Sequence, residues 1–190
     1  MLTSLPNLLT LSRIAAIPLL LVLLYLDTPL FRWLALGGYV LACVTDYFDG
    51  YLARNMNQVS PLGRFLDPIA DKLLVASLIV MLVATQQISG LLIVPAIIIL
   101  AREILVSGLR EYLAEIKVSV PVTTLAKWKT AIQMIALGFL IVGEAGPAVI
   151  PIQWIGEAGL WVAGALTAVT GYDYLSRGLK HMVGEGSGGQ

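Results

Sequence analysis

The sequence predicts an all-α integral membrane protein with six transmembrane helices and both termini in the cytoplasm. Three observations lead to this prediction. Hydrophobic residues make up 58% of the 190 residues and charged residues only 13%, whereas a soluble domain has about 25% charged residues. The apolar residues fall in six runs, each long enough to cross a bilayer core of about 30 Å as a helix. The basic residues between these runs lie almost entirely on one side.

The six apolar runs define the expected elements in chain order, and Gly and Pro residues punctuate the connections between them. Helices are expected at about 5–26, 31–54, 61–84, 90–115, 124–142 and 150–182. Together they predict a single membrane domain over residues 1–182. The Gly-rich segment 183–190 is expected to be a flexible tail.

The basic residues set the orientation of these helices. If the N-terminus is inside, the inner side receives eleven of the 12 Lys and Arg residues, and the outer side receives only Arg32. This imbalance fits the positive-inside rule. The net charge is zero, so bulk charge gives no reason to expect a nucleic-acid partner. The single cysteine, Cys43, excludes an intrachain disulfide and is interpreted as a small packed residue.

Four carboxylates lie near the inner face, at the end of the second expected helix and the start of the third: Asp46, Asp49, Asp67 and Asp71. An ionised Asp near a bilayer centre costs about 2.5–3.5 kcal/mol on insertion scales, so four of them need compensating partners. The first two are three residues apart and the last two are four apart, so each pair shares one helix face. Without His or Cys at ligand spacing, this set favours two Mg²⁺ or Mn²⁺ ions, which usually complete their shells with substrate phosphates.

Small and basic neighbours support a phosphate-bearing ligand at these aspartates. Gly50, Ala53 and Gly63 would allow close approach of a bulky group, and Arg54 offers donors for phosphate oxygens. The structural alternatives are helix capping by Asp67 before Pro68 and glycines that serve only helix packing. A further alternative is that the aspartates form ion pairs with Arg54, Arg64 and Lys72.

These residues resemble the signature of the CDP-alcohol phosphatidyltransferase family. The matching positions are Asp46, Asp49, Gly50, Ala53, Arg54, Gly63, Asp67 and Asp71. The resemblance implies transfer of a phosphoalcohol group from a CDP-linked donor to an alcohol, with release of CMP. It implies that the four aspartates hold two metal ions and that Asp71 deprotonates the attacking hydroxyl. It also implies that Gly50, Ala53, Arg54 and Gly63 bind the nucleotide, and it suggests a homodimer.

Three further stretches, residues 6–13, 101–115 and 125–134, resemble the bacterial phosphatidylglycerophosphate synthase branch of this family. This second resemblance implies CDP-diacylglycerol and glycerol 3-phosphate as substrates, and a bacterial cytoplasmic (inner) membrane location with the active site facing the cytoplasm. The side chains expected to bind the acceptor phosphate are basic: Arg102, Arg110, Lys127, Lys129 and Arg13. Because Lys127 and Lys129 are two residues apart, only one of them is expected to face the site.

Three polar residues repeat every third position at the start of the first helix. Asn7 and Thr10 are expected to hydrogen-bond either the CDP group or a neighbouring helix. Arg13 is costly inside a bundle, so its expected partner is a phosphate or a site aspartate. For Arg102 and Arg110, ion pairs with Glu103, Glu111 or Glu115 are the alternative to acceptor binding.

Two other functions fit parts of the sequence. The first is a sibling enzyme with another acceptor, namely a cardiolipin, phosphatidylserine or phosphatidylinositol-phosphate synthase. The second is a cation transporter in which the aspartates bind a permeating ion. Transporter sites usually lie at the midplane between duplicated halves, whereas these aspartates gather near one face and no internal duplication is evident.

Overall fold

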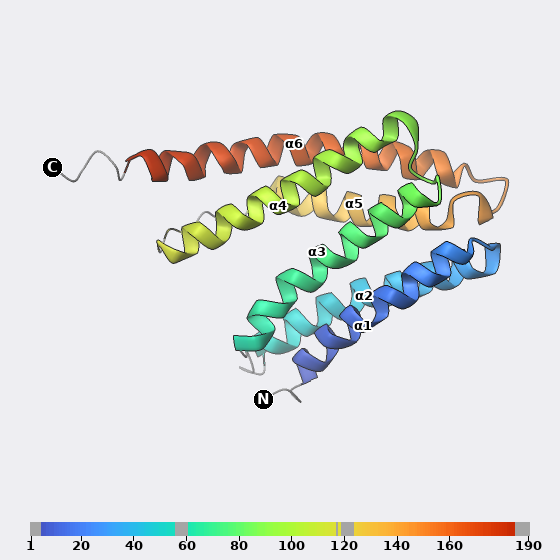
Figure 1. The fold of residues 1–190 in the computed structure, drawn as a ribbon, viewed down its shortest axis with the longest axis horizontal. Coiled ribbons are helices and arrows are strands. Elements are labelled where there is room, and N and C mark those ends of the chain that lie inside the picture. The colour runs from blue at the N-terminus through green and yellow to red at the C-terminus, as the bar shows by residue number, and fades with distance from the viewer. Residues whose placement is uncertain (1–4, 56–60, 117, 119–123, 185–190) are drawn as a thin grey trace. The chain divides into compact units, whose positions relative to one another are not determined.

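The computed structural model describes residues 5–55, 61–116, 118 and 124–184. These residues form helices only, and no strand occurs among them (Figure 1). The α-helices are α1 (Leu5–Leu26), α2 (Pro29–Asn55), α3 (Pro61–Ala84), α4 (Ile93–Glu115), α5 (Thr124–Val142) and α6 (Ile152–Gly184), and the 3-10 helices are η1 (Gly90–Leu92) and η2 (Gly143–Ala145). The predicted all-α class is therefore confirmed, and with η1 counted as the start of α4 the predicted bounds agree to within two residues.

The helices pack as two compact units. Unit 1 comprises Met1–Ser89 and Leu137–Gly156, which include α1, α2, α3, the end of α5 and the first turn of α6. Unit 2 comprises Gly90–Ala136 and Glu157–Gln190, which include α4 and most of α5 and α6. Within the predicted tail, α6 continues to Gly184, and residues 185–190 lie outside the described chain.

In unit 1, α1 packs against both α2 and α3 (Figure 1). The buried stripe of α1 follows the helical period, and beyond its polar start it contains Ile17, Leu20 and Leu24, none of which is more than 7% exposed. The opposite face carries Leu19 and Val22, which are more than half exposed. An exposed apolar face of this kind suits a helix that contacts lipid.

The far end of unit 1 is tied together by Arg32, the one basic residue predicted on the outer side. Its guanidinium pairs with Asp27 (Nε to Oδ1, 2.6 Å) and donates to the carbonyl of Val142 at 3.3 Å. Gly143 follows with φ +49°, and a Cβ there would come within 2.6 Å of Arg32 Nη1. Glycine is therefore required by both conformation and space, and Arg32 connects the α1–α2 turn to the end of α5.

In unit 2, α4 and α6 run parallel in close contact. Three glycines of α6 and three residues of α4 face each other, and both sets repeat every seven residues. The pairs, with the distance that an added Cβ would leave, are Gly164 and Pro95 (2.6 Å), Gly171 and Arg102 (2.8 Å), and Gly178 and Leu109 (2.7 Å). Small residues at a repeated position let two helix backbones approach closely, as in membrane helix packing.

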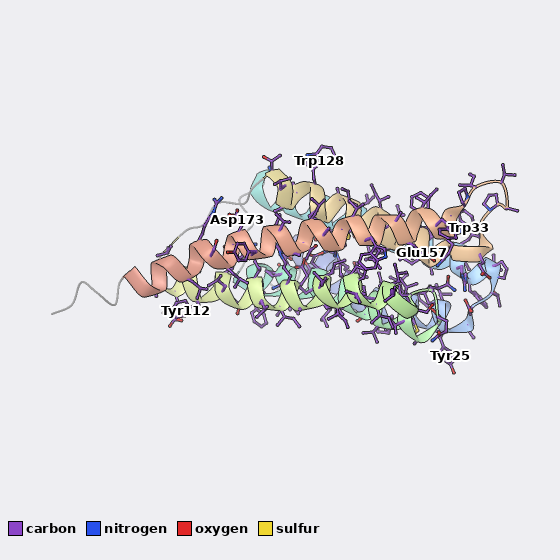
Figure 2. The ribbon with its side chains drawn as sticks, turned by 90° about the horizontal axis from the view of Figure 1, so that it is seen from above. Tyr25, Trp33, Tyr112, Trp128, Glu157 and Asp173 are labelled. Atoms are coloured by element: carbon purple, nitrogen blue, oxygen red, sulfur yellow. The ribbon has the colours of Figure 1, made fainter. Side chains whose placement is uncertain are left out.

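Within the described part of the chain, three helical segments are long and apolar enough to cross a membrane: Asn7–Leu26, Gly90–Glu115 and Thr124–Ala145. Large aromatic side chains are exposed near helix ends, as is typical of membrane interfaces. Figure 2 labels Tyr25 (74% exposed) and Trp33 (46%) in unit 1, and Tyr112 (46%) and Trp128 (63%) in unit 2. These features are those of a membrane protein, whereas the predicted count of six spans stays a prediction.

Candidate active site

The polar residues at the start of α1 are buried inside unit 1. Asn7 and Thr10 are 1% exposed and Arg13 is 2% exposed. Their three-residue spacing places them on one side of the helix, and α1 uses that side to contact α2 and α3. Buried polar groups of this kind need partners, and two of these partners are aspartates.

Two of the predicted metal-binding aspartates are held by α1. The Thr10 hydroxyl donates a hydrogen bond to Asp67 Oδ1 at 2.6 Å. Arg13 Nη1 forms an ion pair with Asp46 Oδ1. The Asp46 side chain is 47% exposed although its arginine partner is buried. The expectation that Arg13 pairs with a site aspartate is therefore confirmed for Asp46, while capping by Asp67 is wrong because α3 begins at Pro61 and continues through Pro68.

Asp71 lies near a pair of residues whose role the sequence analysis missed. The Tyr39 hydroxyl and the Cys43 thiol share a hydrogen bond, and both side chains lie within electrostatic reach of Asp71. Cys43 also faces Asp46 and Arg13. A usable signal was present, because Tyr39, Cys43 and Asp46 follow each other at spacings of four and three on one face of α2.

The remaining predicted site positions of unit 1 lie at the end of α2 and the start of α3. Gly63 is buried at the start of α3, which agrees with a position of close approach. Asp49, Gly50, Ala53 and Arg54 continue α2 as a helix, but their side chains and surroundings lie outside the described part. In the part that is described, no group of three or more His, Cys, Asp or Glu residues is close enough together to hold a metal ion.

The chemistry of the predicted donors in unit 1 fits a hard divalent cation. Asp46, Asp67 and Asp71 offer carboxylate oxygens, which Mg²⁺ and Mn²⁺ prefer. The contacts from Thr10 and Arg13 each engage Oδ1 of an aspartate, and carboxylates that bind metals are normally held by such outer hydrogen bonds. Asp46, Asp67, Asp71 and Asp49 are thus the residues that could hold such an ion.

Unit 2 contains a second group of charged residues. Lys129 of α5 is 1% exposed and forms an ion pair with Glu103 of α4. Arg102 is also near Glu103, with 3.4 Å between Nη1 and Oε1. Arg110 and Lys127 are exposed. Lys129 is thus buried and Lys127 exposed, as expected for two residues two positions apart on a helix.

Buried polar atoms surround this charged group. Arg102 Nε, Gln133 Oε1 and Thr167 Oγ1 are buried in unit 2 without a hydrogen-bond partner among the described residues. Gln133 lies one helical turn after Lys129, and Thr167 lies one turn before Gly171, which contacts Arg102. Neither Gln133 nor Thr167 could be recognised from the sequence, because one uncharged polar side chain in an apolar helix gives no periodic signal.

Comparisons with known proteins agree over most of the chain. The profile of the CDP-alcohol phosphatidyltransferase family matches residues 3–169. A protein of Rickettsia bellii named CDP-diacylglycerol–glycerol-3-phosphate 3-phosphatidyltransferase is 52% identical over 171 residues, which are 90% of this chain and 93% of the relative.

More distant relatives carry two different names. A protein of Cereibacter sphaeroides with the same name as the Rickettsia relative is 39% identical over 96% of this chain and 98% of its own length. A cardiolipin synthase (CMP-forming) of Oryza sativa is 42% identical over 87% of this chain and 54% of its own length. The family match and the aspartates arranged around α1 lead to one conclusion: this chain belongs to the CDP-alcohol phosphatidyltransferase family.

Proposed function

We propose that this protein transfers the phosphatidyl group from CDP-diacylglycerol to glycerol 3-phosphate, giving phosphatidylglycerophosphate and CMP in phospholipid biosynthesis. The observation that carries this proposal is the 52% identity, over 90% of the chain, to a relative named for this reaction. The structure supports it by placing Asp46, Asp67 and the buried start of α1 together in unit 1.

The proposed chemistry is an in-line displacement at the phosphorus that carries the diacylglycerol. The acceptor oxygen forms a bond to this phosphorus while the phosphorus–oxygen bond to CMP breaks. Asp71 accepts the proton of the attacking hydroxyl as general base. Asp46, Asp49, Asp67 and Asp71 would hold two Mg²⁺ or Mn²⁺ ions, which when bound neutralise the pyrophosphate and stabilise the CMP leaving group.

The CDP group is assigned to the end of unit 1 that carries the aspartates. Gly50, Ala53, Arg54 and Gly63 are the proposed nucleotide-binding positions, and the burial of Gly63 supports this role. Asn7 and Thr10 are proposed to extend the same site from α1. For Thr10 this role competes with its hydrogen bond to Asp67.

The acceptor phosphate is assigned to the basic residues of unit 2. Lys129 and Arg102 are proposed contributors, and for both of them this role competes with the contact to Glu103. The unpartnered polar atoms Gln133 Oε1 and Thr167 Oγ1 would suit an acceptor that carries hydroxyl groups as well as a phosphate. Arg110 and Lys127 remain proposed contributors, although both are exposed. For Arg13, the acceptor role competes with its ion pair to Asp46.

A cardiolipin synthase is the second candidate, because the rice relative with that name covers 87% of this chain at 42% identity. The two reactions share the donor and release CMP, and they differ in the acceptor alcohol. The cation transporter considered from the sequence has no support from these relatives, two of which are named as phosphatidyltransferases and one as a cardiolipin synthase.

We also propose that all six helices span the bacterial cytoplasmic membrane, with both termini and the active site facing the cytoplasm. The proposal rests on the distribution of the 12 basic residues and on the three segments already long and apolar enough to span. A homodimer is proposed on the family resemblance, and exposed apolar side chains such as Leu41 and Ile104 could contribute to its interface.

The reaction can be tested by measuring CMP release from purified protein in detergent with CDP-diacylglycerol and Mg²⁺. Parallel assays would contain glycerol 3-phosphate, phosphatidylglycerol, serine or inositol 1-phosphate. We expect release only with glycerol 3-phosphate, and a loss of at least about 100-fold in Asp71→Asn, because a general base contributes about 10²–10⁴-fold. Release with phosphatidylglycerol alone would favour the cardiolipin synthase, and no release from folded protein with any acceptor would contradict both.

A further inference from the structure

The structure connects α1 to two of the four predicted metal-binding aspartates, and these two aspartates lie on different helices. Thr10 contacts Asp67 of α3, and Arg13 contacts Asp46 of α2. Because Thr10 and Arg13 are three residues apart, both side chains project from the same side of α1. One rigid helix therefore fixes where two separate carboxylates lie.

We infer that Thr10 and Arg13 are positioning residues, which act on the reaction by holding Asp67 and Asp46 in the orientation needed for cation binding. This inference rests on the proposed metal site. Each α1 side chain engages Oδ1 of its aspartate, and neither contact uses Oδ2 of the same carboxylate. The hydrogen bonds are made by side chains that are themselves no more than 2% exposed, whereas the Asp46 side chain is 47% exposed.

The burial of the α1 side chains makes them effective supports. The side chain of an aspartate on a membrane helix can adopt several rotamers. If it is fixed in one rotamer only when the metal binds, the lost conformational entropy lowers the affinity for the metal. A hydrogen-bond donor that is itself fixed by packing holds the carboxylate in one rotamer before the metal binds. Such outer hydrogen bonds to metal ligands typically contribute about 10–100-fold in metal affinity. The positive charge of Arg13 also balances Asp46 next to the bilayer.

This role differs from the roles that the sequence suggested for the same residues. If Thr10 only binds the CDP group, its loss raises the KM for CDP-diacylglycerol and leaves metal affinity unchanged. If Arg13 binds the acceptor phosphate, its loss raises the KM for glycerol 3-phosphate. A positioning role predicts weaker metal binding in the absence of both substrates.

The decisive experiment measures Mn²⁺ binding to purified protein in detergent without substrates, using the electron paramagnetic resonance signal of free Mn²⁺. Thr10→Val removes the donor while keeping the branched shape, and Thr10→Ser restores a hydroxyl. Thr45→Val is a matched control, because Thr45 neighbours Asp46 but its hydroxyl bonds only to the backbone carbonyls of Leu41 and Ala42. Thr10→Ala removes the same donor without an added contact, should the valine variant fold poorly.

We expect the Kd for Mn²⁺ to rise about 10-fold or more in Thr10→Val and Thr10→Ala, and to stay within about 2-fold of the wild type in Thr10→Ser and Thr45→Val. Arg13→Gln is expected to lower kcat without raising the KM for glycerol 3-phosphate. Wild-type Mn²⁺ affinity in both Thr10 variants would overturn the inference and leave the metal site intact. A wild-type protein that shows no saturable Mn²⁺ binding would overturn the metal site as well.

Discussion

Lys129 is a buried charged residue that needs a partner of opposite charge. A lysine that is 1% exposed cannot stay charged unless a partner compensates the loss of water, and Glu103 supplies that partner from the neighbouring helix. Breaking a buried pair on one side is costly because the other charge is left alone, whereas replacing both members with neutral residues is often tolerated.

At this scale we predict that Lys129→Met destabilises the protein by about 3 kcal/mol, because Glu103 loses its main partner. The double variant Lys129→Met, Glu103→Gln should recover most of this loss. The measurement is reversible unfolding in mixed micelles, with Lys127→Met as the exposed control, which should change stability by less than about 0.5 kcal/mol. An equal loss in both single lysine variants would show that the buried pair is not what stabilises this part of the chain.

Residue pairing was also the hardest feature to predict from the sequence. Glu103 was foreseen as a partner for Arg102, its neighbour in the chain, but its ion pair with Lys129 joins residues 26 positions apart. Such a contact depends on the register between two helices, which single-sequence periodicity does not contain. For Arg13 the sequence left a phosphate and an aspartate as alternatives, and the structure supplies Asp46.

At the scale of elements, the helices themselves were predictable because hydropathy and length decide them. The six predicted segments match the observed helices closely, since each run of apolar residues ends at charged, Gly or Pro positions. The close contact between α4 and α6 was not predicted. Its signal was present, because Gly164, Gly171 and Gly178 repeat every seven residues, but a glycine repeat does not say which helix packs against it.

The contact between α4 and α6 gives a prediction of its own. Gly164→Ala should lower the thermal unfolding temperature, because its Cβ would come within 2.6 Å of Pro95 Cβ and 3.1 Å of Pro95 Cα, and neither atom can move freely. Gly108→Ala is the matched control, since a Cβ at this helical position meets nothing within 4 Å. Alanine is a better helix former than glycine, so Gly108→Ala should be neutral or stabilising by up to about 1 kcal/mol.

A destabilised Gly108→Ala together with an unaffected Gly164→Ala would contradict the parallel packing of α4 and α6. A double variant of Gly164→Ala with Pro95→Ala offers a further check. No recovery is expected from it, because alanine keeps the Cβ and Cα atoms of residue 95 that an added Cβ at position 164 would meet.

At the scale of the whole molecule, the distribution of charge is the feature that the sequence predicts most directly. Eleven of the 12 basic residues fall on the side assigned to the cytoplasm. The exception, Arg32, is 7% exposed and paired with Asp27. The positive-inside rule concerns the bias of Lys and Arg over the whole chain, so one outer arginine against eleven inner basic residues is compatible with the proposed orientation.

The orientation can be tested by labelling cysteines in intact cells with a membrane-impermeant maleimide. In a Cys43→Ser background, Ser89→Cys lies in the connection between α3 and η1, and we expect labelling without permeabilisation of the cytoplasmic membrane. Ser187→Cys in the C-terminal segment should react only after the membrane is opened. The reverse pattern would overturn the proposed orientation, and equal labelling of both positions would overturn the even number of spans.

The buried pair of Lys129 and Glu103 has a consequence for how the protein enters the membrane during synthesis. A lysine at the centre of a lone helix in lipid costs about 2.5–3.5 kcal/mol on insertion scales, and Lys129, near the start of α5, would carry part of that cost until Glu103 is beside it. The segment that carries Glu103 is synthesised first. We therefore expect α4 to stay beside the insertion machinery until α5 has been synthesised. The two helices then enter the bilayer together, with the charges of Lys129 and Glu103 paired.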